Sequence, residues 1–175
     1  MQSVSLFRTS AAALLAAALA ACAPAAPVPA GTTLAAASSA PAPRGDATAL
    51  PSITVHRDAY CGCCHAWVEH LRAEGFQVED RVEEDMSPVK QRLGIMPEHA
   101  SCHTAEIDGY VVEGHVPAAD IRRLLRERPD IRGLTLPGMP LGSPGMEVEG
   151  MAPEPYTVLA IGRDGQAAAY AEHRP

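Results

Sequence analysis

The sequence predicts an α/β domain over residues 51–175, a mixed sheet with flanking helices. Strand-like and helix-like patterns alternate along this region. Two turn signals, Asp108-Gly109 and Arg163-Asp164-Gly165, each lie between strand-like segments and predict hairpins. Six of the seven aromatic residues of the chain follow residue 50, so the hydrophobic core is expected there. These three observations indicate one domain of ordinary size.

The first half of this domain reads as strand, helix, strand, helix. Residues 52–57 are β-branched and short, and residues 76–82 alternate apolar and polar side chains, as strands do. Between them, apolar residues recur at helical spacing, and Gly75 closes the predicted helix. This apolar stripe consists of Cys64, Trp67, Val68 and Leu71. Ser87-Pro88 begins a second, shorter helix that ends at Gly94.

The second half contains the two hairpins with one helix between them. Residues 101–107 and 110–115 form the first hairpin, and residues 156–162 and 166–171 form the second. The intervening helix ends before Pro129, because a residue preceding proline disfavours helical backbone. Its apolar stripe is Ile121, Leu124 and Leu125, and the basic residues near its end are Arg126 and Arg128.

Residues 133–155 have an unusual composition, with five Gly, five Pro and three Met among 23 residues. Loops of this length without secondary structure are uncommon in compact domains unless they are functional or disordered. One interpretation is a proline-stiffened cover over the sheet. The other is a lid that carries thioether ligands, with Met139 and Met146 as the candidates.

The N-terminal residues read as a sorting signal and a tether. Residues 1–21 contain one cation and an Ala/Leu run of about 11 residues, which is too short to span a membrane comfortably. The run ends at Cys22 in a pattern that resembles a bacterial lipobox, so Cys22 is the expected lipidation site. Residues 22–50 are rich in Ala and Pro and predict a disordered, flexible tether. We therefore expect an exported, membrane-anchored lipoprotein that faces the periplasm, with the outer membrane favoured. A soluble periplasmic protein is the alternative.

The charge of the chain excludes one class of function. Its net charge is −7, whereas nucleic-acid binding needs a basic face, so we expect no nucleic-acid partner. We expect contact with a membrane only through the lipid anchor.

The predicted chemistry is concentrated in four cysteines. Cys61, Cys63 and Cys64 occupy three of four positions at the N-terminus of a predicted helix, where the helix dipole favours thiolates. The order of elements resembles a thioredoxin-type arrangement, which would bring Cys102 near them at the start of a central strand. Cys61 and Cys64 alone have the spacing of a thiol–disulfide oxidoreductase, but a third thiol between them would trap or scramble a redox disulfide.

A metal site explains this crowded set of thiols better. Unpaired thiols in an exported protein would oxidise, so they are expected in disulfides or bound to metal. Soft sulfur ligands select Cu(I), and several Cu(I) ions bridged by thiolates would neutralise four negative sulfurs. Zinc is the less favoured metal, because Cys₄ zinc sites usually combine two separated Cys-x-x-Cys pairs.

The same segments resemble a known family. They are residues 60–71 with Cys-Gly-Cys-Cys-His, residues 100–105 with Ser-Cys-His-Thr, residues 108–117, and the Gly-Met-Pro-Leu-Gly-Ser-Pro-Gly-Met run at residues 138–146. They resemble the CopG-type periplasmic copper-resistance proteins from about Ile53 to the C-terminus. The resemblance implies a thioredoxin-like domain in which Cys61, Cys63, Cys64 and Cys102 hold a thiolate-bridged copper cluster.

The histidines are weaker candidates than the cysteines. His65 lies in the first helical turn and His103 follows Cys102, so both are candidate outer ligands. On a strand, however, the side chain of His103 would point away from that of Cys102. His115 is interpreted as structural. The other four, His56, His70, His99 and His173, are expected on solvated surfaces.

These observations support three hypotheses. The first is a protein that binds several Cu(I) ions for copper resistance or homeostasis in the cell envelope, with redox interconversion of copper as an added role. The alternative is a thiol–disulfide oxidoreductase with Cys61 and Cys64 as its catalytic residues, and the third is a structural zinc or iron–sulfur module. A metal-binding protein is favoured over an enzyme. Its expected partners are copper ions and other envelope copper-handling proteins.

Overall fold

The computed structural model describes residues 50–174, which contain seven strands, three α-helices and one 3₁₀ turn. Their order confirms the predicted α/β fold with a thioredoxin-like mixed sheet. None of the helices in this part of the chain is long and apolar enough to cross a membrane. The predicted signal peptide (1–21), Cys22 and nearly all of the predicted tether (22–50) lie outside the described residues.

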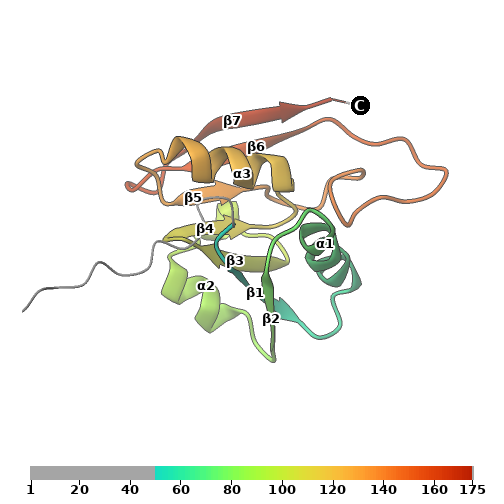
Figure 1. Cartoon of the computed structure of the whole chain (residues 1–175), viewed down its shortest axis with the longest axis horizontal. Helices are drawn as coiled ribbons and strands as arrows, with labels where there is room; N and C mark the ends of the chain where they lie inside the picture. Colours follow the sequence, from blue (N-terminus) through green and yellow to red (C-terminus); the bar gives the residue numbers. More distant parts are fainter. Residues whose placement is uncertain (1–49, 175) are drawn as a thin grey trace, which may run out of the picture. The chain divides into compact units, whose positions relative to one another are not determined.

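The seven strands form one sheet in the order β2-β1-β3-β4-β5-β6-β7 (Figure 1). The pairs β1–β2 and β4–β5 are parallel, and α1 and α3 supply the crossovers that parallel pairs require. The other four pairs are antiparallel and include both predicted hairpins, β3–β4 and β6–β7. The strands are β1 (Ile53–Asp58), β2 (Val78–Glu83), β3 (His103–Ile107), β4 (Tyr110–Glu113), β5 (Gly133–Thr135), β6 (Tyr156–Ile161) and β7 (Ala167–His173).

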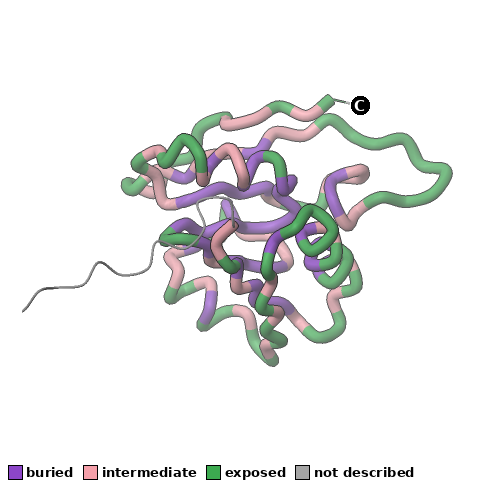
Figure 2. Tube along the Cα trace, in the orientation of Figure 1, coloured by how far each residue is buried: buried purple, intermediate pink, exposed green. Residues whose placement is uncertain are grey.

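The two faces of the sheet are covered differently. On one face, the main core packs α1 (Gly62–Ala73) and α3 (Ala118–Glu127) against the strands, and Val112 of β4 belongs to it. The neighbouring residue Val111 belongs to a second, smaller cluster with Ile95, which follows α2 (Ser87–Leu93). Successive strand residues point to opposite faces, so α2 covers the other face. Figure 2 shows the buried residues concentrated in the central strands.

The face covered by α2 buries polar side chains. His56, Thr104 and Glu113 lie side by side across β1, β3 and β4, and all three are buried. Buried polar groups are costly unless they are hydrogen-bonded, and each of these three has partners. Glu113 also accepts a hydrogen bond from the backbone N–H of Ser101, which lies just before β3.

Two histidines in this region correct the sequence analysis. His56 and His99 were expected in solvent, but both are buried. The His56 ring lies between the carboxylates of Glu83, at 2.6 Å, and Glu106, at 3.2 Å. His99 Nε2 lies 3.1 Å from the carbonyl oxygen of Gly165. A polar tip with a partner lets histidine enter the interior, and sequence spacing does not reveal such partners.

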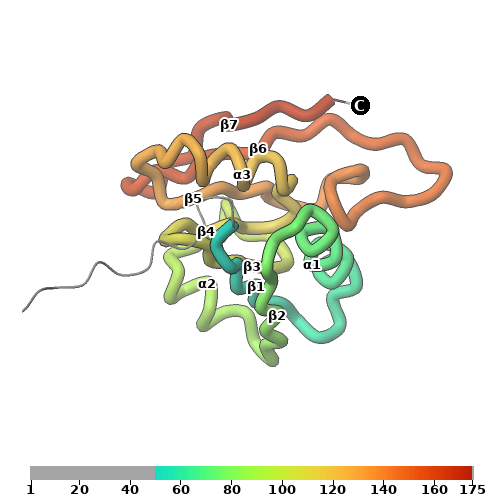
Figure 3. Tube along the Cα trace, in the orientation of Figure 1, coloured from blue at the N-terminus to red at the C-terminus, as the bar shows by residue number. Residues whose placement is uncertain are grey.

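Strand β5 is a second correction, because it lies within the Gly/Pro-rich segment that was read as loop. A Cβ atom on Gly133 would lie 1.8 Å from the carbonyl oxygen of Val111, so the pairing of β5 with β4 needs glycine there. Residues 136–155 contain neither helix nor strand. Figure 3 shows this loop in orange, extending beyond the sheet between β5 and β6 with its inner part beside α1.

Candidate metal centre

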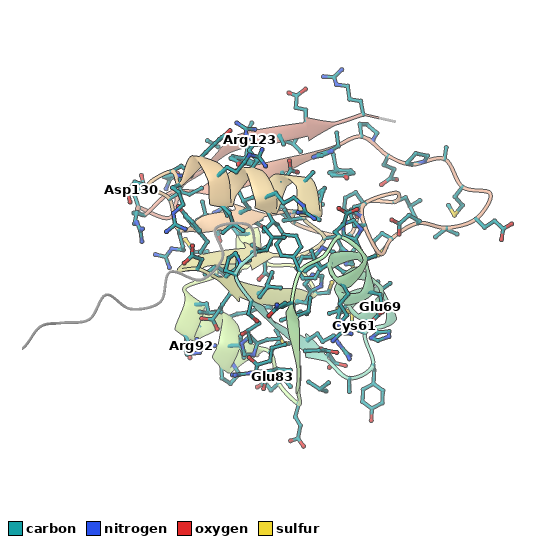
Figure 4. The ribbon with its side chains drawn as sticks, viewed as in Figure 1. Cys61, Glu69, Glu83, Arg92, Arg123 and Asp130 are labelled. Carbon is teal, nitrogen blue, oxygen red and sulfur yellow. A yellow bond between two sulfur atoms is a disulfide. The ribbon has the colours of Figure 1, made fainter. Side chains whose placement is uncertain are left out.

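The end of β1 and the start of α1 position three of the cysteines. Cys61 is the N-cap of α1, and its Sγ accepts a hydrogen bond from the backbone N–H of Cys64 at 3.3 Å. Its own N–H donates to the carbonyl of Asp58, which ties the short turn to β1. Cys63 and Cys64 follow in the first helical turn, as the sequence predicts (Figure 4 labels Cys61). A helix N-terminus concentrates free N–H groups here.

The fold brings the fourth cysteine to this helix terminus. Cys102 immediately precedes β3, and β3 is the antiparallel neighbour of β1. The Sγ atoms of Cys61, Cys63, Cys64 and Cys102 all lie within 4.8 Å of one another. The fold therefore brings the four predicted cysteines together where the N-terminus of α1 meets the start of β3.

The sulfurs are present in two chemical forms. Cys61 and Cys64 are joined by a disulfide, whereas Cys63 and Cys102 are the free thiols of the described chain. Cys63 Sγ lies 3.4 Å from Cys61 Sγ, close enough to contact the disulfide directly. In this form the site offers two thiols, and it offers four only after the disulfide is reduced.

Burial and the neighbouring Cys63 raise the pKa of the Cys102 thiol to about 12. Burial acts first, because it disfavours the charged thiolate, and a second negative sulfur nearby adds to the effect. Cys102 is therefore a neutral thiol at physiological pH in the metal-free protein, and a bound cation would favour its deprotonation.

Two buried histidines complete a second group of ligand atoms around Cys102. His103 Nδ1 lies 3.3 Å and His115 Nε2 lies 3.1 Å from Cys102 Sγ. Burial is the main cause of the lowered pKa of both rings, so both are neutral at physiological pH. His103 also lies against Trp67, with ring centroids 4.4 Å apart. The alternation rule placed its ring away from Cys102, but Cys102 precedes the strand, so strand alternation does not apply.

The hydrogen bonds of His115 define its tautomer. Its Nδ1 lies 2.8 Å from the carbonyl oxygen of Pro144, which can only accept, so Nδ1 carries the proton. The lone pair of Nε2 then faces Cys102 Sγ. The bond to Pro144 fits the interpretation of His115 as structural. Its place beside Cys102 could be found from the two-residue turn at Asp108-Gly109. Extending the β3–β4 register from Thr104↔Glu113 outward places Cys102 opposite His115.

The loop of residues 136–155 lies over the same site. Met139 Sδ is 4.0 Å from Cys63 Sγ. Gly145 packs so tightly on α1 that a Cβ atom there would lie 2.8 Å from both Cys63 O and Trp67 N. Met146 is half-buried nearby, and its backbone N–H donates to the carbonyl of Ser143. These contacts place the loop against α1 and Met139 beside Cys63, so the cover and the lid with thioether ligands both stay predictions.

The remaining candidate ligand lies outside the cluster. His65 is exposed on the first turn of α1 and belongs to neither group of converging ligand atoms. His103 has the opposite environment: its Nε2 is buried and lacks a hydrogen-bond partner among the described residues. The nitrogen that faces Cys102 Sγ is Nδ1, at 3.3 Å, so the unpartnered Nε2 is not the atom nearest the cysteine site. Four sulfurs and neutral imidazoles form a soft donor set that suits copper and zinc better than magnesium or calcium.

The comparisons with known proteins agree with this geometry. Residues 99–146 match a family model described as a protein of unknown function, DUF411. Two solved structures, copper resistance protein CopG in its form 2 and form 1, are each 56% identical in sequence with a TM-score of 0.67. The matches cover 71% and 72% of this chain, respectively, and 99% of each of those chains. No curated protein matches the chain.

Proposed function

Since this chain belongs to the family of the CopG copper resistance proteins, we propose that it binds copper for resistance or homeostasis in the cell envelope. The observation that carries this proposal is the convergence of four cysteine sulfurs within 4.8 Å. The named relatives supply the choice of copper, and the softness of sulfur agrees with it.

We propose further that the reduced site holds several Cu(I) ions bridged by Cys61, Cys63, Cys64 and Cys102. Four thiolates around a single monovalent ion would leave three negative charges in a partly buried site, which is costly. Several bridged Cu(I) ions reduce that excess charge. The outer ligand candidates closest to the sulfurs are His103, His115 and Met139. The structure offers less support for His65 and Met146.

The disulfide between Cys61 and Cys64 supports a link between copper binding and redox state. Disulfide sulfurs lack the thiolate charge, so four-thiolate binding requires two-electron reduction of this bond first. In the other direction, two thiolates that close into the disulfide release two electrons. Those electrons balance the reduction of two Cu(II) ions to two Cu(I) ions. Redox interconversion of copper is therefore part of the proposal.

An anaerobic Cu(I) titration of the reduced full-length chain tests the binding proposal. We expect more than one copper per chain for the wild type and clearly fewer for Cys63→Ser and Cys102→Ser. Met96→Leu is the matched control, because Met96 is an exposed thioether beside the Gly165 turn. A Cys102→Ser variant that retains the full copper content would contradict the four-cysteine site, and reproducible zinc or iron in protein purified without added copper would favour the third hypothesis.

A thiol–disulfide oxidoreductase is the second candidate, and the Cys61–Cys64 disulfide favours it. Cys63 argues against it, because its sulfur lies 3.4 Å from Cys61 and can attack the disulfide within the molecule. This candidate predicts catalysed exchange with a dithiol substrate. If Cys63→Ala raises exchange activity and copper binding is weak, the oxidoreductase is the better account.

We also propose that the protein is exported and anchored through a lipid on Cys22. The support is the sequence pattern, a short Ala/Leu run that ends at Cys22. Metabolic labelling with a fatty acid tests the anchor. We expect label in the wild type and none in Cys22→Ala, and equal labelling of the two would contradict it.

A further inference from the structure

A buried carboxylate lies directly behind the segment that carries Cys102. Glu113 ends β4 on the face covered by α2, and its side chain is fully buried. One oxygen, Oε1, accepts hydrogen bonds from Lys90 Nζ and, at 2.6 Å, from the backbone N–H of Ser101. The other, Oε2, accepts from Thr104 Oγ1 at 2.6 Å. Lys90 also donates to Thr104 Oγ1 at 3.0 Å, so the polar groups form a closed network.

A gain in folding stability does not by itself explain why Glu113 and Lys90 are buried together. Burying a carboxylate and an ammonium group carries a large desolvation cost, and well-packed apolar residues often stabilise a protein as well or better. A charge-assisted hydrogen bond to a backbone N–H, in contrast, fixes a loop with defined geometry. The loop fixed here is Ser101-Cys102, which directly precedes β3.

Ser101 also connects this network to the 136–155 loop that covers the site. Ser101 Oγ donates to the carbonyl of Gly138 at 2.7 Å, and Gly138 directly precedes Met139. Gly114, which follows Glu113, has no room for a Cβ atom, which would lie 2.5 Å from Leu136 O and 2.7 Å from the Ser101 side chain. The segments that carry Cys102, His115 and Met139 are thus packed together around Ser101.

We propose that Glu113, neutralised by Lys90, is a positioning residue that holds Cys102 in the geometry needed for copper binding. This proposal rests on the proposed function. Its physical basis is that Glu113 anchors the Ser101 backbone from behind, while Lys90 cancels the carboxylate charge that would otherwise disfavour thiolates nearby. Glu113 does not contact the sulfurs, so it acts through the backbone of the residue before Cys102.

The test compares Glu113→Gln with a matched control, Glu106→Gln, in the full-length chain. Glu106 is a half-exposed carboxylate on β3 that pairs with Arg92 and His56 and does not bond to the Cys102 segment. In Glu113→Gln the amide oxygen can still accept from Lys90 and from the Ser101 N–H, and the amide N–H₂ can donate to the Thr104 hydroxyl, but the side chain is uncharged. Lys90 then lacks its anionic partner, and the hydrogen bond to Ser101 loses its charge assistance. Two readouts are measured: Cu(I) affinity, and the alkylation rate of Cys102 relative to Cys63 in reduced, metal-free protein, resolved by mass spectrometry.

We expect Glu113→Gln to weaken Cu(I) binding about 10- to 100-fold, the usual effect of losing a partner that orients a ligand. The Cys102:Cys63 alkylation ratio should rise, because a released loop exposes Cys102. Glu106→Gln should change neither readout more than about twofold, the small effect usual for substitution of an exposed side chain. If Glu113→Gln behaves like Glu106→Gln in both, the proposal is overturned.

A second pair of variants covers the case in which Glu113→Gln does not fold. Thr104→Val removes the donor to Glu113 Oε2, whereas Thr104→Ser keeps the hydroxyl. The proposal expects Thr104→Val to raise the Cys102:Cys63 ratio and Thr104→Ser to restore it. Equal ratios in the two would contradict it. Because alkylation needs no copper, a wild type that binds none would refute the proposed function while the ratios still decide whether Glu113 positions Cys102.

Discussion

At the residue scale, the thiol of Cys102 differs from an ordinary cysteine in its protonation. Its pKa is raised to about 12, first by burial and then by Cys63, so it holds its proton through the whole physiological range. A metal ligand must be deprotonated, so copper binding at Cys102 releases one proton. The neighbouring His103 and His115 have lowered pKa values, so neither carries a proton that binding must displace near neutral pH.

This difference predicts a specific pH dependence of copper binding. Between pH 7 and 8, apparent Cu(I) affinity should rise with pH, by about tenfold per pH unit for each displaced proton. In Cys102→Ser the logarithmic slope should be about one unit smaller, because that proton is no longer released. Competition with a chelator of known pH dependence measures both slopes. Identical slopes would show that Cys102 does not bind copper as a thiolate.

The role of His115 is tested by two substitutions that copy different atoms of its ring. His115→Asn keeps a donor near the position of Nδ1, which bonds to Pro144, and His115→Gln keeps a polar atom near the position of Nε2, which faces Cys102. If Nε2 supports the copper site, His115→Asn should weaken Cu(I) binding more than His115→Gln. Thermal unfolding of the metal-free variants is the control, and the reverse order of affinities would indicate that the Pro144 bond is the important one.

The site residues differ in how far the sequence could predict them. The four cysteines were predicted together, because three of them share a helix terminus and the element order places Cys102 on the neighbouring strand. His115 was interpreted as structural, and its position opposite Cys102 needs the hairpin register as well as the local sequence. Glu113 carries no local signal at all. Its importance depends on Lys90, which comes from a helix 23 residues earlier in the chain.

At the scale of elements, the contact between the 136–155 loop and α1 determines how closely the loop covers the cysteines. Gly145 and Gly150 both have positive φ, +84° and +80°, but only a Cβ on Gly145 would meet the α1 backbone. Both changes to alanine should cost about 1 kcal/mol of backbone strain. Gly145→Ala should cost clearly more, because the loop must move away from Cys63 and Trp67. Chemical denaturation measures both, and equal losses would mean that the loop does not depend on this contact.

Trp67 gives α1 a spectroscopic link to the site. It is the only tryptophan of the chain, it is fully buried, and its ring lies 4.4 Å from the His103 ring. Its Nε1 donates to the carbonyl of Val116 at 2.9 Å, which satisfies the buried indole N–H. Copper binding beside His103 should change the Trp67 fluorescence in step with the copper content. A fluorescence that stays constant as copper binds would place the metal elsewhere.

The elements with a local pattern were predicted, and those defined by distant contacts were not. The helices that end at Gly75 and Gly94, and both hairpins, follow from spacing and turn residues. Strand β5 was missed, because Gly133 fits against Val111 for a reason that only the folded sheet supplies. The same holds for His56, whose two carboxylate partners come from β2 and β3.

At the scale of the whole molecule, the two faces of the sheet bury different kinds of side chain. One face supports the apolar core beneath α1 and α3, and the other buries the polar row of His56, Thr104 and Glu113 beneath α2. The copper site is expected where the strand ends and the α1 terminus meet. All the candidate copper ligands lie within residues 61–146.

This arrangement predicts that the N-terminal residues do not contribute to copper binding. A chain that begins at residue 50 should bind the same number of Cu(I) ions as the full-length protein with the same affinity, because every proposed ligand is retained. Parallel titrations of the two reduced proteins measure this. A lower copper content in the shorter chain would show that residues 1–49 contribute to the site.

The central claim is that four cysteines hold several copper ions together. The most direct measurement is copper content combined with thiol protection on one sample of the reduced, full-length chain, loaded with Cu(I) under anaerobic conditions. The account predicts more than one copper per chain, with Cys61, Cys63, Cys64 and Cys102 all protected from alkylation until copper is removed. One copper or none, or a reactive Cys102 in the loaded protein, would contradict it.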